Sequence, residues 1–487
     1  MAKAIMLQGT MSNVGKSFLT AALCRIFKQD GYSVAPFKSQ NMALNSYITD
    51  DGMEIGRAQA MQAEAAGIAP SVLMNPILLK PTTDVGSQVI VNGKVRGNMK
   101  AREYFKNKTE LIPEIMKAYD TLASQHDIIV IEGAGSPAEL NMKKDDIVNM
   151  GLAKLVGAPV LLIGDIDRGG VFAQLLGTLD LLEPDERSMV KGLIVNMFRG
   201  DPTLFDDGIK IMEGKSGLPV LGVVPSAHID IEDEDSLSHK LSGDSMPKLI
   251  DIAVISLPRI SNFTDLDVFA QYEDVSVRYI KKYTELGEPD LIIIPGTKST
   301  ITDMKWLRES GIETVIKKAA VKGTPVFGIC GGYQMLGTVI SDPENTEGGG
   351  EITGMDLLSG TTVFVGNKRQ EQVSGKFNEV TGFWECLSGA QFTGYEIHMG
   401  RTEQHDSELT SCGGMFSGNV AGCYVHGIFD DVSDALIEKL YQIKGIKRNG
   451  AKIDRRAYKE QQYDLLADVV RKSLDMDKVY RILQEGV

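Results

Sequence analysis

The chain has 487 residues, of which 51 are Lys or Arg and 65 are Asp or Glu, so its formal charge is -14. At ~100–200 residues per domain, this length predicts two or three domains. A hydrophobic share of 43% excludes wholesale disorder, and the acidic excess argues against nucleic acid as a partner because it repels phosphates. The apolar runs are too short to cross a bilayer and no secretory leader is evident, so we expect a cytoplasmic protein without a membrane partner.

Short apolar runs alternate with amphipathic stretches throughout the first half of the chain. KAIMLQG, HDIIVIEG, APVLLIGD and KGLIVNMF have the pattern of buried strands, and helix-like segments separate them. This alternation predicts an α/β domain over residues 1–235, with a parallel sheet covered on both faces. Ligands of such sheets bind at the carboxyl ends of the strands, so functional side chains should follow the apolar runs directly.

A glycine-rich turn, GTMSNVGKS at residues 9–17, follows the first predicted strand and precedes an amphipathic helix. It has the context of a P-loop, although it holds one residue more between its glycines than the common pattern. In a P-loop the backbone N–H groups surround phosphate oxygens, the lysine neutralises their charge and the hydroxyl holds magnesium. The sequence therefore predicts a nucleotide site formed by Gly9, Thr10, Asn13, Val14, Gly15, Lys16 and Ser17.

Three further polar residues follow predicted strands of this domain. Glu132 ends the run HDIIVIE, where the metal and the γ-phosphate lie in a P-loop fold, and is the predicted partner of Ser17 in holding magnesium. Lys38 follows YSVAPF and is placed for phosphates, and Asn196 follows KGLIV and is placed to contact adenine. For Lys38 and Asn196, capping of a loop is an equally good interpretation.

The character of the chain changes near residue 236. Residues 236–250 are polar, acidic and rich in Gly, Ser and Pro, which is typical of a linker. The strand-and-helix alternation then restarts with IDIAVISLP, DLIIIPGT and TPVFGICGG, and TTVFV, FNEVTGFWE and AGCYVHG predict further strands, so residues 251–446 form a second α/β domain. Residues 447–487 have the apolar spacing of a packed C-terminal helix pair.

Cys330 is distinguished from the other cysteines by its local sequence. The five cysteines are scattered and lack a C-x-x-C pair, which argues against a disulfide framework and a zinc site. In TPVFGICGGYQMLG, however, a strand stops at Cys330, two glycines permit a tight turn and a helix begins, as in a nucleophile elbow. A helix N-terminus stabilises a thiolate, and the N–H of Gly331 is placed to hold an oxyanion. Gly296, just after the strand LIII, is the predicted second donor; a plain strand-to-helix turn is the alternative.

A cysteine nucleophile needs a base, and two histidines are candidates. His426 ends the strand-like run AGCYVHG in the same domain and is the preferred base. His398, in GYEIHMGRT, also follows a strand and competes with it. A substrate-binding or structural role fits His398 equally well.

These motifs, taken in order, resemble the cobyric acid synthase family of glutamine-dependent amidotransferases of cobalamin biosynthesis, over nearly the whole chain. The resemblance is carried by GTMSNVGKS, FKSQNMALNS, EIGRAQAMQA, NPILLKP with SQVIVNG, VIEGAGSPAE, GDIDRGGVFA, VNMFRGD, RISNFTDLD, PGTKST, GICGGYQMLG, GYEIHMGRT and YVHGIFD. It implies an N-terminal ATPase domain like dethiobiotin synthetase, using ATP and Mg²⁺. It also implies a C-terminal class I glutamine amidotransferase domain with Cys330 as nucleophile and His426 as base.

The resemblance further implies the substrates. These are L-glutamine and the corrinoid adenosylcobyrinic acid a,c-diamide, whose b, d, e and g side-chain carboxylates are amidated to give adenosylcobyric acid. Resemblance and position together predict that the corrinoid contacts Gln40, Asn41, Ser261, Asn262, Thr264 and Asp265. For the SNFTD segment, a capped turn with Ser261 or Asn262 as N-cap is the alternative.

One departure from the class I amidotransferase pattern concerns the third member of the catalytic triad. Most such domains have a glutamate two residues after the histidine, whereas here Ile428 stands at that position. Asp430 or a backbone carbonyl is a candidate to orient His426 instead. Two other functions compete with the preferred one: a cobyrinic acid a,c-diamide synthase, and a P-loop ATPase switch of the partitioning type with a regulatory second domain. The oligomeric state is left open by the sequence.

Overall fold

Two units make up the chain in the computed structural model, which describes residues 2–83, 86–227, 229–231, 246–448 and 454–487. The first unit contains Met1–Met42, Ile55–Glu232 and Arg456–Val487, and the second contains Ala43–Glu54 and Asp233–Arg455. This division assigns residues 43–54 to the second unit and most of the C-terminal extension to the first. The predicted linker 236–250 lies outside the described residues as far as position 245, and Ile250 opens a strand.

A six-stranded parallel sheet forms the centre of the first unit, in the order β12-β11-β10-β1-β9-β2. The strands are β1 (Lys3–Gly9), β2 (Val34–Phe37), β9 (Ile128–Glu132), β10 (Val160–Asp165), β11 (Val190–Phe198) and β12 (Val220–Pro225). They are the apolar runs that the sequence analysis assigned to strands. The N-terminal unit is therefore the parallel α/β domain that the alternation predicted.

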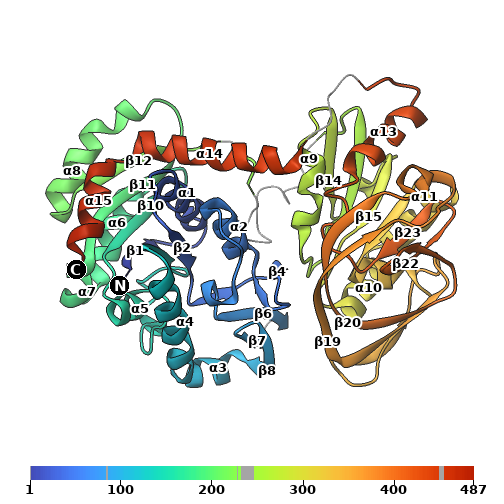
Figure 1. Cartoon of the computed structure of the whole chain (residues 1–487), viewed down its shortest axis with the longest axis horizontal. Helices are drawn as coiled ribbons and strands as arrows, with labels where there is room; N and C mark the ends of the chain where they lie inside the picture. Colours follow the sequence, from blue (N-terminus) through green and yellow to red (C-terminus); the bar gives the residue numbers. More distant parts are fainter. Residues whose placement is uncertain (1, 84–85, 228, 232–245, 449–453) are drawn as a thin grey trace. The chain divides into compact units, whose positions relative to one another are not determined.

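Alternate residues of these strands enter two different apolar cores, one on each face of the sheet. Helices on one face are α1 (Lys16–Gln29), α14 (Arg455–Ser473) and α15 (Met476–Glu485), and those on the other include α4 (Ile112–Gln125), α5 (Met150–Val156), α6 (Val171–Leu181), α7 (Pro184–Met189) and α8 (Asp206–Ser216). The helix α2 (Arg57–Ala66) contributes to both cores. Figure 1 shows α14 and α15, in red, beside the strands of this unit.

The C-terminal helix pair is bound to the first unit by charge as well as by apolar packing. Arg25 of α1 forms ion pairs with Glu460 and Asp464 of α14, each at 2.8 Å. Leu466 and Val479 are fully buried in the core that α1 also enters. The last helices of the chain therefore complete the fold of the nucleotide domain.

Two small sheets lie between β2 and β9 in the sequence. One has the order β3 (Gln40–Met42), β6 (Ile77–Thr83), β7 (Gly86–Val91) and β8 (Lys94–Lys100), and α3 (Ala101–Asn107) follows it. The other contains β4 (Ser46–Ile48) and β5 (Glu54–Gly56). The chain thus leaves the large sheet after β2 and returns to it through α4.

The second unit is built on a seven-stranded sheet in the order β14-β13-β15-β16-β23-β22-β21. The parallel strands are β13 (Ile250–Ile255), β14 (Val275–Ile280), β15 (Leu291–Ile294), β16 (Val326–Ile329) and β23 (Val420–Cys423). An antiparallel edge is added by β22 (Gly413–Ser417) and β21 (Ser407–Thr410). The helices of this unit are α9 (Asp267–Ala270), α10 (Thr300–Glu309), α11 (Ile312–Val321), α12 (Gly331–Leu336) and α13 (Ser433–Ile443). Both units are therefore α/β, as predicted.

A second sheet of this unit contains β17 (Val339–Asp342), β18 (Gly350–Thr353), β19 (Gly360–Lys376) and β20 (Gln391–Gln404). The strand prediction for FNEVTGFWE, residues 377–385, is wrong: β19 ends at Lys376, and Phe377 forms only an isolated bridge to Thr410. A 3-10 helix covers Gly382–Leu387, because Gly382 has a φ of 69°, which an extended strand does not allow. The apolar side chains of this segment enter the core from the 3-10 turn and not from a strand. Trp384, for example, is fully buried and lies edge-on against Phe327.

Within the described ranges, no helix combines the length and the apolar character that a bilayer crossing demands.

Candidate active sites

The predicted P-loop connects β1 to α1 in the first unit. Gly15 has a φ of 87°, and a Cβ there would lie 2.2 Å from the side-chain nitrogen of Asn196. A glycine is required at this position for both its conformation and its lack of a side chain. The ammonium group of Lys16 donates to the carbonyls of Met11 and Gly135, each at 3.1 Å, and so lies across the loop.

Glu132 is the centre of a polar cluster at the end of β9. Its side chain is 1% exposed and accepts three hydrogen bonds: from the hydroxyl of Ser17 at 2.8 Å, from the ammonium of Lys38 at 2.8 Å and from the amide of Gln62 at 2.6 Å. A buried carboxylate with this many donors is held in one orientation. Glu132, Ser17 and Lys38 are predicted from the sequence to belong to one site, and the fold brings these three together.

Gln62 is a residue that the sequence analysis missed at this site. It lies on α2, more than one element away from both Ser17 and Glu132 in the chain. The motif EIGRAQAMQA contains it, but nothing in that pattern indicates which of its polar side chains faces the P-loop. Only the packing of α2 against α1 and β2 places the amide on the carboxylate.

Three other predicted nucleotide residues lie in or beside the P-loop. Asn196 donates from its side chain to the carbonyl of Val14 at 2.8 Å and so supports the P-loop main chain. The hydroxyl of Thr10 donates to Gln174 at 3.1 Å. Asn13 has a left-handed φ of 61°. For Asn196 the observed bond is the loop-capping role that the sequence left open.

The second unit contains a sharply turned cysteine between β16 and α12. Cys330 has φ 52° and ψ -108°, a strained conformation for a residue with a side chain. A Cβ on Gly332 would lie 2.0 Å from the carbonyl oxygen of Ile294, so the following turn has room only for glycine. This geometry is the nucleophile elbow that the sequence GICGG predicted. The thiols of Cys24 and Cys423 are buried almost completely, and this burial raises their pKa.

Two loops meet beside Cys330 as an oxyanion hole requires. A Cβ on Gly331 would lie 3.1 Å from the backbone nitrogen of Thr297, so the start of α12 is close to the loop after β15. Gly296 is in that same loop, and a Cβ added to it would lie 3.0 Å from the Cε1 atom of His426. The predicted pair Gly296 and Gly331 therefore lies in one neighbourhood with the predicted base, and backbone N–H groups there can bind a developing negative charge.

His426 is oriented by an aspartate, Asp265. The Nδ1 atom of His426 is 2.6 Å from Oδ2 of Asp265, and the other carboxylate oxygen accepts from the N–H of Gly427 at 3.0 Å. Burial by itself lowers the pKa of His426, but the carboxylate of Asp265 and the nearby Cys330 outweigh it and raise the pKa to about 10. A histidine whose pKa is raised in this way accepts a proton readily as a base and, once protonated, can donate it to a leaving group.

From the sequence we expect Asp265 to contact the corrinoid, and Asp430 is a candidate to orient the histidine. The structure places these side chains differently. Asp265 occupies the position of the third triad member, and Asp430 lies 3.2 Å from the guanidinium of Arg455. The motif RISNFTDLD contained the signal, but its carboxylates could not be ranked without knowing which one faces His426.

His398, the competing base, is engaged on both ring nitrogens. Nδ1 is 2.7 Å from the carbonyl of Gly400 and Nε2 is 3.2 Å from the carboxylate of Glu396, and the ring stacks on Tyr424. Both ring nitrogens of His398 therefore already have hydrogen-bond partners, whereas the Cys330 thiol lies beside His426. This arrangement favours His426 as the base.

The predicted corrinoid residues are divided between the two units. In the first unit, Gln40 accepts from the hydroxyl of Tyr104 and Asn41 donates to Gln59 at 2.9 Å. Ser261, Asn262 and Thr264 belong to the second unit and are all buried. Asn262 precedes the 3-10 helix Phe263–Leu266, as the capped-turn alternative predicted, but its side chain does not cap that helix.

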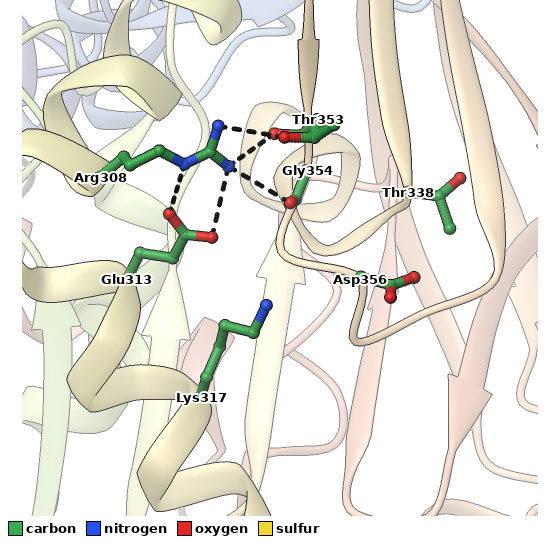
Figure 2. Close-up of a pocket in the computed structure, with 7 residues that line it drawn as sticks. All are labelled: Arg308, Glu313, Lys317, Thr338, Thr353, Gly354 and Asp356. Atoms are coloured by element: carbon green, nitrogen blue, oxygen red, sulfur yellow. Dashed lines mark hydrogen bonds and ion pairs between the residues drawn. The ribbon is translucent and has the colours of Figure 1, made fainter.

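A surface pocket of about 560 Å³ lies elsewhere on the second unit, and none of its lining residues belongs to the cysteine centre. Figure 2 shows that the guanidinium of Arg308 is directed at Glu313 and at the main chain of residues 353–354. The acceptors within the protein account for the orientation of the Arg308 guanidinium, so its position in the pocket does not indicate a ligand. The lining residues are Arg308, Glu313, Lys317, Thr338, Thr353, Gly354 and Asp356.

Replacement of Asp265 by Asn tests the observed triad. We expect kcat/KM for glutamine hydrolysis to fall by about 10²- to 10⁴-fold, since the orienting carboxylate of a triad is worth up to about 10⁴. Without that carboxylate the pKa of His426 falls from about 10, so the alkaline limb of the pH–rate profile moves to lower pH. The matched control is Asp430→Asn, which removes the alternative carboxylate. A shift with Asp430→Asn and none with Asp265→Asn would reverse the assignment.

Comparisons with known proteins identify a domain type for each half of the chain. Residues 5–237 match the CobQ/CobB/MinD/ParA nucleotide binding domain, and residues 251–433 match the CobB/CobQ-like glutamine amidotransferase domain. Among curated relatives, cobyric acid synthase from Lachnoclostridium phytofermentans is 57% identical, with all of both chains covered. The enzymes of the same name from Ruminiclostridium cellulolyticum and Dehalococcoides mccartyi strain 195 are 56% and 52% identical, with all of this chain and 98% and 99% of theirs covered. The chain therefore belongs to the cobyric acid synthase family of glutamine-dependent amide ligases.

Proposed function

We propose that the chain amidates the b, d, e and g side-chain carboxylates of adenosylcobyrinic acid a,c-diamide, using ATP, Mg²⁺ and L-glutamine, and releases adenosylcobyric acid. The family membership supports amidation in cobalamin biosynthesis. The observation that carries the proposal is the presence, in one chain, of a P-loop centred on Glu132 and a strained cysteine beside the pair His426–Asp265. Neither centre alone accounts for amide synthesis from a carboxylate.

The first centre activates the substrate carboxylate, which by itself is a poor acyl donor. A carboxylate oxygen of the corrinoid attacks the γ-phosphorus of ATP, the bond to the β-phosphate oxygen breaks, and an acyl phosphate and ADP result. Lys16 and Lys38 carry the positive charge that the transferred phosphoryl group needs, and Ser17 and Glu132 are the hard oxygen ligands that suit Mg²⁺. When bound, the metal ion screens the charge of the phosphates. Ammonia then attacks the acyl carbon and expels phosphate.

The second centre supplies that ammonia. The thiolate of Cys330 attacks the side-chain amide carbon of glutamine, and the backbone N–H groups near Gly331 and Gly296 stabilise the oxyanion. The carbon–nitrogen bond breaks as His426 donates its proton to the leaving nitrogen. Water then hydrolyses the glutamyl thioester, so that glutamate leaves and the thiol is restored. Asp265 holds the imidazole in the orientation that this proton transfer requires.

The substrate assignment is tested by mass spectrometry of the corrinoid product. Purified protein is supplied with ATP, Mg²⁺, glutamine and, in separate reactions, adenosylcobyrinic acid a,c-diamide or cobyrinic acid, and amides are counted from the product mass. We expect conversion to adenosylcobyric acid, and no amidation of cobyrinic acid at the a and c positions. Amidation of cobyrinic acid to the a,c-diamide alone would instead identify the neighbouring synthase. ATP hydrolysis without any amide product would favour the switch protein.

A further inference from the structure

The segment Ala43–Glu54 belongs to the second unit, although the chain on both sides of it belongs to the first. Shortly before the segment, the ammonium of Lys38 lies 2.8 Å from the carboxylate of Glu132. Shortly after it, Gln62 donates to the same carboxylate at 2.6 Å. A residue shortly before the segment and a residue shortly after it therefore both contact the buried carboxylate of Glu132.

Side chains of β19 bind the far part of the segment. Two main-chain carbonyls accept from glutamine side chains, and a buried ion pair joins the end of the segment to the strand, where the carboxylate is 0% exposed. Removing one partner of a buried ion pair leaves the other charge uncompensated, so this pair holds the segment in place strongly. The contacts are Gln372 Nε2 to Ile48 O, Gln370 Nε2 to Gly52 O at 2.7 Å, and Lys368 Nζ to Glu54 Oε2.

Ser46, at the start of β4, is hydrogen-bonded through its main chain on both sides. Its N–H donates to the side-chain oxygen of Asn262 at 2.9 Å, and its carbonyl accepts from the hydroxyl of Tyr395 at 3.1 Å. Ile48 is fully buried and packs with Tyr395 and Ile397 in a small apolar cluster. The near part of the segment is thus attached to Asn262 and Tyr395 by both polar and apolar contacts.

Both residues that Ser46 contacts support the catalytic histidine. The ring of Tyr395 stacks on His426 with centroids 5.3 Å apart, and their main chains exchange hydrogen bonds of 2.8 and 3.1 Å. Asn262, with a left-handed φ of 52°, starts the short helix that carries Asp265. A displacement of Ser46 would therefore act on His426 through its stacking partner and through its carboxylate partner.

We propose that Tyr395 is a positioning residue for His426 and that the segment Ala43–Glu54 couples glutamine hydrolysis to the state of the nucleotide centre. Occupation of the nucleotide centre acts on Lys38 and Gln62, and the segment between them transmits that change to Ser46. Glutamine is then hydrolysed fastest when an acyl phosphate is present to take the ammonia. The inference rests on the proposed function. It requires that ATP and the corrinoid acceptor bind more tightly when the segment keeps its contacts to Asn262, Tyr395 and β19 than when these contacts are broken.

The coupling is measured as a ratio. Glutamate release is recorded without ligands and with ATP, Mg²⁺ and adenosylcobyrinic acid a,c-diamide, and the stimulated rate is divided by the unstimulated rate. In Tyr395→Phe, which keeps the aromatic ring but removes the donor to Ser46, we expect the ratio to fall by about 2- to 10-fold, the factor that one hydrogen bond supplies. In Lys368→Met, which removes the ammonium group that pairs with Glu54, we expect the stimulated rate to fall towards the unstimulated one.

The matched control is Lys376→Met, because Lys376 is an exposed lysine at the end of the same strand β19. It should leave the ratio as in the unmodified protein. Synthesis with ammonium salts is measured in every variant and should be unaffected, since it bypasses His426. Unchanged ratios in both Tyr395→Phe and Lys368→Met would overturn the coupling proposal. Failure of the unmodified protein to form amide from either nitrogen source would instead overturn the proposed function.

Discussion

Cys330→Ala will abolish amide synthesis from glutamine and leave synthesis from ammonium salts within about twofold of the unmodified rate. The expected loss is of the order of 10⁴-fold or more, because removal of the nucleophile of a comparable hydrolytic triad costs about 10⁶ in kcat. Ammonia-dependent synthesis survives because the acyl phosphate forms in the other unit, at the P-loop. The measurement is corrinoid amide formation with each nitrogen source in turn.

The matched control for this prediction is Cys386→Ala. Cys386 is partly buried in the same unit, and its thiol lies 3.7 Å from the carbonyl of Phe383, in the 3-10 turn rather than at the elbow. Both nitrogen sources should support normal synthesis in that variant. An equal loss with glutamine and with ammonia in a folded Cys330→Ala protein would contradict the division of labour between the two centres.

Lys16→Ala will abolish synthesis from both glutamine and ammonium salts, whereas Cys330→Ala abolishes only the synthesis from glutamine. The ammonium group of Lys16 lies across the P-loop, and the phosphoryl group that is transferred loses this charge stabilisation in the variant. Loss of a single preorganised donor costs about 10²- to 10³-fold in kcat, so we expect a decrease of at least that size. The measurement is corrinoid amide formation together with ATP hydrolysis.

Glutamine hydrolysis without ATP should persist in Lys16→Ala, because the cysteine centre contains none of the P-loop residues. Lys210→Ala is the matched control, since Lys210 is an exposed lysine of α8 in the same unit, where it pairs with Asp207 at 2.9 Å. That variant should retain full synthesis. Normal amide formation in Lys16→Ala would mean that the carboxylate is activated without the P-loop.

The parts of the two centres that sequence alone determined are contiguous in the chain. The P-loop from Gly9 to Ser17 and the turn at Cys330 are each a strand end, a few special residues and a helix start. Their geometry follows from local rules: glycine where φ is positive or where no side chain fits, and a helix N-terminus where negative charge must be bound. The parallel α/β architecture was predictable for a similar reason, because buried parallel strands are continuous apolar runs.

The partner of His426 was decided by the tertiary structure. Asp265 and His426 are 161 residues apart, and the contact exists because the loop after β13 and the residues after β23 both end at the same edge of the sheet. Several aspartates in that part of the chain have equivalent local sequence, so no local rule could select one of them. The choice between His426 and His398 has the same origin, since it depends on which imidazole has its nitrogens already engaged.

The segment Ala43–Glu54 shows the same limit on a larger scale. Nothing in its sequence indicates that it packs on β19 and β20 rather than on its neighbours in the chain, and we assigned it to the nucleotide domain. Its attachment depends on Tyr395, Lys368 and Asn262, which lie hundreds of residues away. Backbone conformation is set mostly by neighbouring residues, whereas side-chain contacts between distant segments are set by how the whole chain packs. Sequence therefore identified the two chemistries, and only the folded chain determined which residues support them.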